Sequence, residues 1–104
     1  MGKSDPYLLN FYKSMIKSKY YENIGFFGQS GENFLSQDLN SNSRKFYDLS
    51  LDNWNINDFP YEIDEKFDLI VCTRCAYFCK HPHELIKSFM KMLNPNGLIL
   101  IDWG

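Results

Sequence analysis

The sequence predicts an α/β fold in which a mostly parallel sheet carries helices on both faces. Three observations predict this class. Short and nearly continuous apolar runs indicate strands that are covered on both sides. Segments with apolar residues at three- and four-residue spacing indicate amphipathic helices between them. The last third of the chain has the order strand, helix, strand, which implies a parallel pair with a right-handed crossover.

The first predicted element is a helix near the amino terminus. Its apolar stripe is formed by Leu8, Phe11, Tyr12, Met15 and Ile16, and its polar face by Lys13, Lys17 and Lys19. A three- and four-residue spacing places such a stripe on one side of a helix, where it packs against the sheet. We therefore expect a packing helix with no chemical role.

The middle of the chain is predicted from shorter signals. The apolar run at 24–27 predicts a buried strand, and a turn with two glycines follows at 28–32. A weak helix is expected over 34–39, through Phe34, Leu35 and Leu39. Polar residues 40–43 predict a loop, and the partial alternation of residues 45–51 predicts a second strand.

The remainder of the chain gives clearer patterns. Residues 52–66 are polar and contain a proline, which predicts a loop. The apolar run at 67–72 predicts a third buried strand. A helix is expected from His81-Pro82 with an apolar stripe, and the sequence Asn-Pro-Asn-Gly at 94–97 predicts its end. Residues 98–101 predict the fourth strand.

Composition limits the kinds of partner. The chain has 104 residues, enough for one domain over residues 1–104. Eleven Lys and Arg residues are interspersed with 13 Asp and Glu residues, so a nucleic-acid partner is not expected. No apolar run approaches the roughly 20 residues that span a bilayer, so no membrane partner is expected either. The absence of a secretory signal and the three clustered cysteines predict a cytoplasmic protein.

The last third of the chain also resembles a known family. Phe67-Asp68-Leu69-Ile70-Val71, Leu93-Asn94-Pro95-Asn96-Gly97 and Leu98-Ile99-Leu100-Ile101 follow one another with a helix between the first two. This block resembles the second half of the core of class I S-adenosylmethionine-dependent methyltransferases. The resemblance implies a Rossmann-like fold, incomplete relative to the seven-stranded methyltransferase core. It also implies S-adenosyl-L-methionine as cofactor and an unidentified methyl acceptor as substrate.

The resemblance suggests which residues hold the cofactor. The turn GFFGQSGEN follows the first strand, and glycines there allow close approach of a ligand to the backbone. Asp48 lies at a predicted strand end, where a carboxylate can accept hydrogen bonds from two ribose hydroxyls. The implied cofactor-binding residues are Gly28, Gln29, Ser30, Gly31, Asp48, Thr73 and Arg74.

Some site assignments stay open at this point. Asp52 and Asp58 compete with Asp48, because either can match the acidic residue that the family places near adenine. Asp48 can instead cap the following turn. Relatives often carry Glu-His where this chain has Tyr77-Phe78, so no catalytic residue is assigned.

Two rival hypotheses come from other classes of protein. Cys72, Cys75, Cys79, His81 and His83 fall within twelve residues, which is the composition of a metal or dithiol redox site. The second rival is a non-catalytic interaction or regulatory module of the same fold. We expect the chain to be shortened, with the last strands of the family core missing after Gly104. A homo- or hetero-oligomer that covers the exposed sheet edge is then expected.

Overall fold

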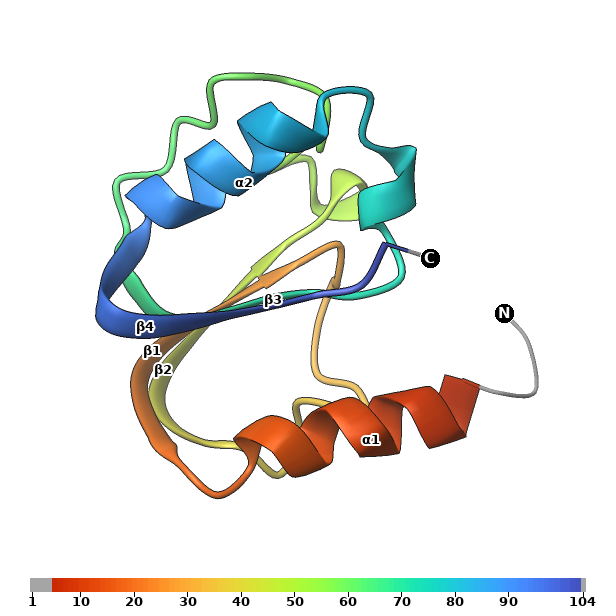
Figure 1. Cartoon of the computed structure of the whole chain (residues 1–104), viewed down its shortest axis with the longest axis vertical. Helices are drawn as coiled ribbons and strands as arrows, with labels where there is room; N and C mark the ends of the chain where they lie inside the picture. Colours follow the sequence, from red (N-terminus) through yellow and green to blue (C-terminus); the bar gives the residue numbers. More distant parts are fainter. Residues whose placement is uncertain (1–4, 104) are drawn as a thin grey trace.

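Four parallel strands form a single sheet in the computed structural model, in the order β2-β1-β3-β4 (Figure 1). The strands are β1 (Tyr20–Phe27), β2 (Asn40–Tyr47), β3 (Phe67–Cys72) and β4 (Leu93–Ile101). The structure describes residues 5–103, and the side chains of residues 10–103. The parallel pairing of all four strands confirms the predicted fold class.

The sheet lies between two layers (Figure 1). Helix α1 (Asp5–Ile16) covers one face, and helix α2 (Pro82–Lys91) covers the other. The long connection from β2 to β3 runs on the α2 side. Its aromatic and aliphatic side chains pack beside α2 on a core that includes Phe27, Phe67 and Phe89. A second core, which includes Ile24 and Leu35, lies on the α1 side.

Helix α1 packs through a face that only partly matches the predicted one: Ile16 and Tyr12 of the predicted stripe lie in or against the core, and Lys13 lies beside them. The Lys13 side chain is buried, with 7% of the residue exposed, and its Nζ donates to Phe34 O at 3.1 Å and to Asp38 Oδ2 at 2.6 Å. Phe11 and Met15, both placed in the predicted apolar stripe, are mostly exposed. The assignment of Lys13 to the solvent face was wrong because an acidic partner and a backbone carbonyl satisfy its ammonium group. The Leu8 side chain lies outside the described residues.

The weak helix expected over 34–39 is a series of turns. The Asn33 side chain accepts hydrogen bonds from the backbone N–H groups of Leu35 and Ser36, at 2.9 and 3.0 Å. Such side-chain bonds compete with helical ones. Arg44 on β2 also donates to the carbonyl oxygens of Ser36 and Leu39. This segment therefore stays a compact turn held by the neighbouring strand.

The other predicted elements lie close to their observed positions, although residues 48–51, predicted as part of the second strand, lie beyond its end at Tyr47 and form a 3-10 turn. The strand at 67–72 and the helix from Pro82 are confirmed. Strand β2 begins at Asn40, so residues 40–43, predicted as loop, belong to the sheet. Strand β4 likewise includes the predicted turn at 94–97, where its register with β3 is irregular. The polar character of residues 40–43 hid a strand that pairs with β1 through backbone hydrogen bonds, which need no apolar side chain, whereas residues 94–97 form an irregularity between the paired residues Leu93 and Leu98.

Candidate cofactor site at the carboxyl edge of the sheet

The ends of the four strands are tied together at one edge of the sheet. Gly28, directly after β1, donates its N–H to Tyr47 O at the end of β2, at 2.7 Å. Asp102, directly after β4, donates its N–H to Cys72 O at the end of β3, at 3.1 Å. In parallel α/β sheets, ligands bind beyond these carboxyl ends.

Gly28 also meets the loop that follows β3. Its φ of 82° lies in the left-handed region, which favours glycine. A Cβ atom at this position would lie 2.5 Å from Cys75 Sγ and 2.9 Å from Cys75 Cβ. Only a glycine therefore lets the β1 end and the β3 loop approach this closely.

A cavity of about 470 Å³ opens at this edge of the sheet. Its volume lies in the range that is typical of small-molecule sites. Residues that follow β1, β2 and β3 all contribute to it. The lining residues are Gly28, Asp48, Leu49, Trp54, Asn55, Ile56, Asn57, Arg74, Cys75 and Phe78.

Three of the seven predicted cofactor residues, Gly28, Asp48 and Arg74, line this cavity together. Asp48 is also the N-cap of the short 3-10 helix η1 (Leu49–Leu51), and its Oδ2 accepts hydrogen bonds from the backbone N–H and the hydroxyl of Ser50. The capping alternative for Asp48 is therefore correct, and the same side chain also borders the cavity. Arg74 has a φ of 64°, so the β3 loop turns sharply at this residue.

The other four predicted residues do not line the cavity. The Gln29 side chain donates to Gly31 O at 2.9 Å and to Ser36 Oγ at 3.1 Å, so it stabilises the turn itself. Ser30 is exposed, and Gly31 has open space where a Cβ would be placed. Thr73, the first residue after β3, is buried. The glycine-rich turn thus contributes one residue to the cavity, because it curves away from the strand ends after Gly28.

Sequence reasoning missed most of the segment from Leu49 to Asn57 that lines the cavity. Asn57 shows how this segment is held, since its Nδ2 donates to Phe78 O at 3.1 Å and its Oδ1 accepts from Lys80 N at 2.7 Å. These bonds fix the segment against the 3-10 helix η2 (Ala76–Phe78), which follows β3. The amide and aromatic residues of this segment show no periodicity in the sequence, so only the composition of the segment could have indicated a binding role.

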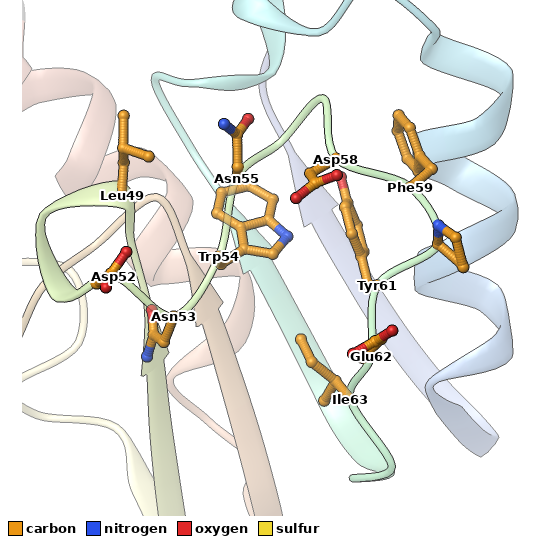
Figure 2. A pocket seen from close by; sticks show the side chains of 11 residues that line it. Leu49, Asp52, Asn53, Trp54, Asn55, Asp58, Phe59, Tyr61, Glu62 and Ile63 are labelled. Atoms are coloured by element: carbon orange, nitrogen blue, oxygen red, sulfur yellow. The ribbon is translucent and has the colours of Figure 1, made fainter.

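A second and larger cavity, of about 600 Å³, is formed by residues 49–63 of the β2–β3 connection (Figure 2). Asp52 and Asp58 line this cavity and not the smaller one. Trp54 and Tyr61 pack edge to face in its wall, with ring centroids 5.5 Å apart. Burial raises the pKa of Tyr61, whose hydroxyl donates to Ile56 O at 2.7 Å. Residues that follow β1 and β3 line the smaller cavity and not this one.

Two of the three thiols lie against each other beside the smaller cavity. Cys72 Sγ and Cys75 Sγ are 3.0 Å apart, and Cys75 Sγ lies 3.5 Å from Phe27 O. The hydrogen bond between the thiols lowers the pKa of Cys75 and, together with burial, raises the pKa of Cys72. Among residues 5–103, no group of three His, Cys, Asp or Glu side chains is arranged to hold a metal ion.

Comparison with known proteins identifies the family. The family model described as a methyltransferase domain matches residues 29–101, from just after β1 to the end of β4. The chain belongs to this methyltransferase domain family. The family is part of the class I S-adenosylmethionine-dependent methyltransferase superfamily, so the predicted resemblance is confirmed. None of the characterised proteins and none of the solved structures compared with the chain matches it.

Membership of the methyltransferase domain family agrees with the observed architecture. A four-stranded parallel sheet with flanking helices is a partial form of the Rossmann-like methyltransferase fold. Family members generally use S-adenosylmethionine and act on a substrate. The match does not favour the metal, redox or non-catalytic hypotheses. Neither helix of residues 5–103 has the length and hydrophobicity needed to cross a bilayer.

Proposed function

We propose that this methyltransferase domain binds S-adenosylmethionine in the cavity at the strand ends and transfers its methyl group to an acceptor. One observation carries the proposal: Gly28, Asp48 and Arg74, which follow three different strands, border one cavity. Ligands of parallel α/β sheets bind at this edge. The methyl acceptor is left unassigned, since small molecules, sugars and proteins all remain candidates.

The residues of the cavity fit a nucleoside-bearing cofactor. Asp48 supplies a carboxylate that can accept hydrogen bonds from two neighbouring ribose hydroxyls. Leu49 and Ile56 supply apolar surface suited to a flat base, and Asn55 supplies an amide that can donate and accept. Gly28 keeps the backbone bare where β1 meets the site. We propose Gly28, Asp48 and Arg74 as contacts, with Gln29, Ser30, Gly31 and Thr73 shaping the loops behind them.

The contribution of the chain to the reaction is mainly positional. The bound cofactor supplies an activated methyl group, so the protein needs no covalent intermediate. The rigid strand ends fix the position of the cofactor, and apolar side chains such as Phe78 and Trp54 exclude water from it. We assign no side chain as general base.

Two broader proposals accompany this function. The three cysteines are free thiols, which fits the cytoplasm as a reducing compartment.

Within residues 5–103, β4 pairs with β3 on one side only. We propose that an added strand, from a second copy or another partner, covers this apolar edge.

Calorimetric titration with S-adenosylhomocysteine tests the cofactor proposal. We expect a dissociation constant in the micromolar range for the unaltered chain. Asp48→Asn removes the negative charge but keeps an oxygen that can accept from Ser50, and we expect it to weaken binding about tenfold, or about 1.4 kcal/mol. Asp52→Asn is the matched control, because Asp52 borders only the larger cavity. Asparagine also tolerates the left-handed φ of 56° at residue 52.

The outcomes separate the hypotheses clearly. Equal loss of affinity in both variants would move the ribose contact away from Asp48. Loss in Asp52→Asn alone would transfer the site to the larger cavity. A folded chain that gives no heat at millimolar ligand would contradict cofactor binding and favour the interaction module.

A further inference from the structure

The thiol pair at the end of β3 has the geometry of a site of reversible oxidation. Cys72 is the last residue of β3 and is fully buried. The chain then turns back through Arg74, whose φ is 64°, and this turn brings Cys75 Sγ to 3.0 Å from Cys72 Sγ. A disulfide needs the two sulfur atoms only about 1 Å closer, at roughly 2.05 Å. The closure therefore requires the two sulfur atoms to approach by only about 1 Å.

The two thiols differ in access and in reactivity. Cys75 lines the strand-end cavity and is partly exposed, whereas Cys72 lies behind it in the core. The hydrogen bond with Cys72 holds the pKa of Cys75 below its ordinary value, which favours the thiolate that reacts with oxidants. Cys75 is thus placed as the attacking residue and Cys72 as the resolving one.

We propose that Cys72 and Cys75 form a reversible disulfide on the wall of the strand-end cavity when the protein meets a hydroperoxide. This is a modification site on a methyltransferase domain and does not make the chain a redox enzyme. Disulfides of this kind in reducing compartments are transient and often regulatory.

The chemistry balances with the peroxide as the oxidant. The Cys75 thiolate attacks one oxygen of hydrogen peroxide, the O–O bond breaks, and Cys75 sulfenic acid and hydroxide form. The Cys72 thiol then attacks the Cys75 sulfur and displaces the sulfenic oxygen as water. The two thiols lose two electrons and two protons in total, and the peroxide is reduced to two molecules of water. A dithiol reductant reverses the change.

Oxidation of Cys75 and binding of the cofactor in the strand-end cavity should exclude each other. This expectation rests on the proposed function. Cys75 Sγ packs where the Cβ of residue 28 would be and contacts Phe27 O. Bond formation with Cys72 would shift this sulfur and so change the cavity lining beside Gly28. A molecule bound in the cavity would, in turn, cover Cys75. We therefore expect S-adenosylhomocysteine to slow oxidation at least tenfold.

Peptide mapping after oxidation tests the proposal directly. The folded chain is treated with hydrogen peroxide, blocked with an alkylating reagent and digested with trypsin. Cleavage after Lys66, Arg74 and Lys80 places Cys72 in one peptide (FDLIVCTR) and both Cys75 and Cys79 in the next (CAYFCK). We expect the two peptides to be joined, so that the mass of the product is two hydrogen atoms lower than the sum of the two peptides, and we expect them to separate after reduction. Blocked but unjoined peptides from a fully folded sample would overturn the proposal.

Variants identify the pair and separate the two proposals. Cys79→Ser should leave the joined peptides unchanged, and loss of the cross-link in this variant would assign the bond to Cys79. Cys75→Ser should abolish the cross-link, and a retained cross-link would contradict the pairing. A urea-unfolded sample should cross-link at least tenfold more slowly, because the native 3.0 Å contact is lost. Cross-linking does not require a bound cofactor, so a failed titration with S-adenosylhomocysteine would overturn the proposed function and leave the disulfide standing.

Discussion

Replacing Gly28 with alanine tests the convergence of strand ends on which the candidate site depends. Gly28 has a φ of 82°, and a left-handed conformation costs an L residue about 1–2 kcal/mol. The added Cβ would also lie 2.5 Å from Cys75 Sγ, and overpacking of this kind costs about 1–3 kcal/mol. We therefore expect Gly28→Ala to lower the free energy of unfolding by roughly 2–5 kcal/mol. Such a loss is a large part of the total stability of a small domain.

Urea unfolding followed by circular dichroism measures this effect. The midpoint should fall by at least about 0.7 M for Gly28→Ala, given a denaturant slope of about 1–3 kcal/mol per M. Gly31→Ala is the matched control, because nothing lies within 4 Å of the position that its Cβ would take and its φ is not left-handed. We expect the control to change stability by less than about 0.5 kcal/mol, or to increase it slightly.

A double-mutant cycle separates the two causes. Cys75→Ala removes the sulfur atom at 2.5 Å but keeps the Cβ atom at 2.9 Å, so the cost of Gly28→Ala in that background should fall towards the backbone strain of about 1–2 kcal/mol without reaching it. An unchanged cost would show that Cys75 does not lie against residue 28. Equal stability of Gly28→Ala and Gly31→Ala would refute the left-handed turn itself.

Two further predictions concern stability. Lys13→Ala should lower the free energy of unfolding, measured in urea, by about 1 kcal/mol, because the variant lacks the ion pair with Asp38 and the buried aliphatic part of the side chain. Lys17→Ala should have little effect, and equal effects of the two substitutions would contradict the burial of Lys13. Burial raises the pKa of the Tyr61 hydroxyl above its ordinary value of 10.0. Just above pH 10, this hydroxyl therefore ionises in the unfolded chain and stays protonated in the folded one. The contribution of Tyr61 to stability should be constant below about pH 10 and fall above it. Tyr61→Phe should reduce the slope of stability against pH in that range, at the cost of the hydrogen bond to Ile56, and an unchanged slope would exclude Tyr61 as a cause.

The sequence alone was sufficient to predict the helices and strands whose apolar pattern reflects burial. β3 and the carboxyl half of β4 are short apolar runs, and α2 has a clear apolar stripe, so their type follows from which faces must leave water. The same segments carry the turn chemistry that gives the resemblance to methyltransferases. The apolar pattern of these segments thus predicted the fold class, and the same segments carried the resemblance to the family.

The local sequence was misleading where polar side chains form tertiary contacts. Residues 40–43 are polar and yet pair with β1, because an edge strand needs backbone partners more than apolar side chains. Lys13 is buried because Asp38, twenty-five residues away, lies in the turn that packs on α1. Neither contact leaves a signal in its own segment.

The candidate site divides in the same way. The sequence by itself indicated that Gly28 follows one strand and that Asp48 lies near the end of another, which places both at one edge of a parallel sheet. Only the tertiary structure decided that the turn curves away after Gly28, that residues 49–57 complete the cavity, and that Cys75 meets Cys72. The physical reason is that strand ends are positioned by local periodicity and pairing, whereas loop conformation depends on hydrogen bonds and packing between residues far apart in the chain.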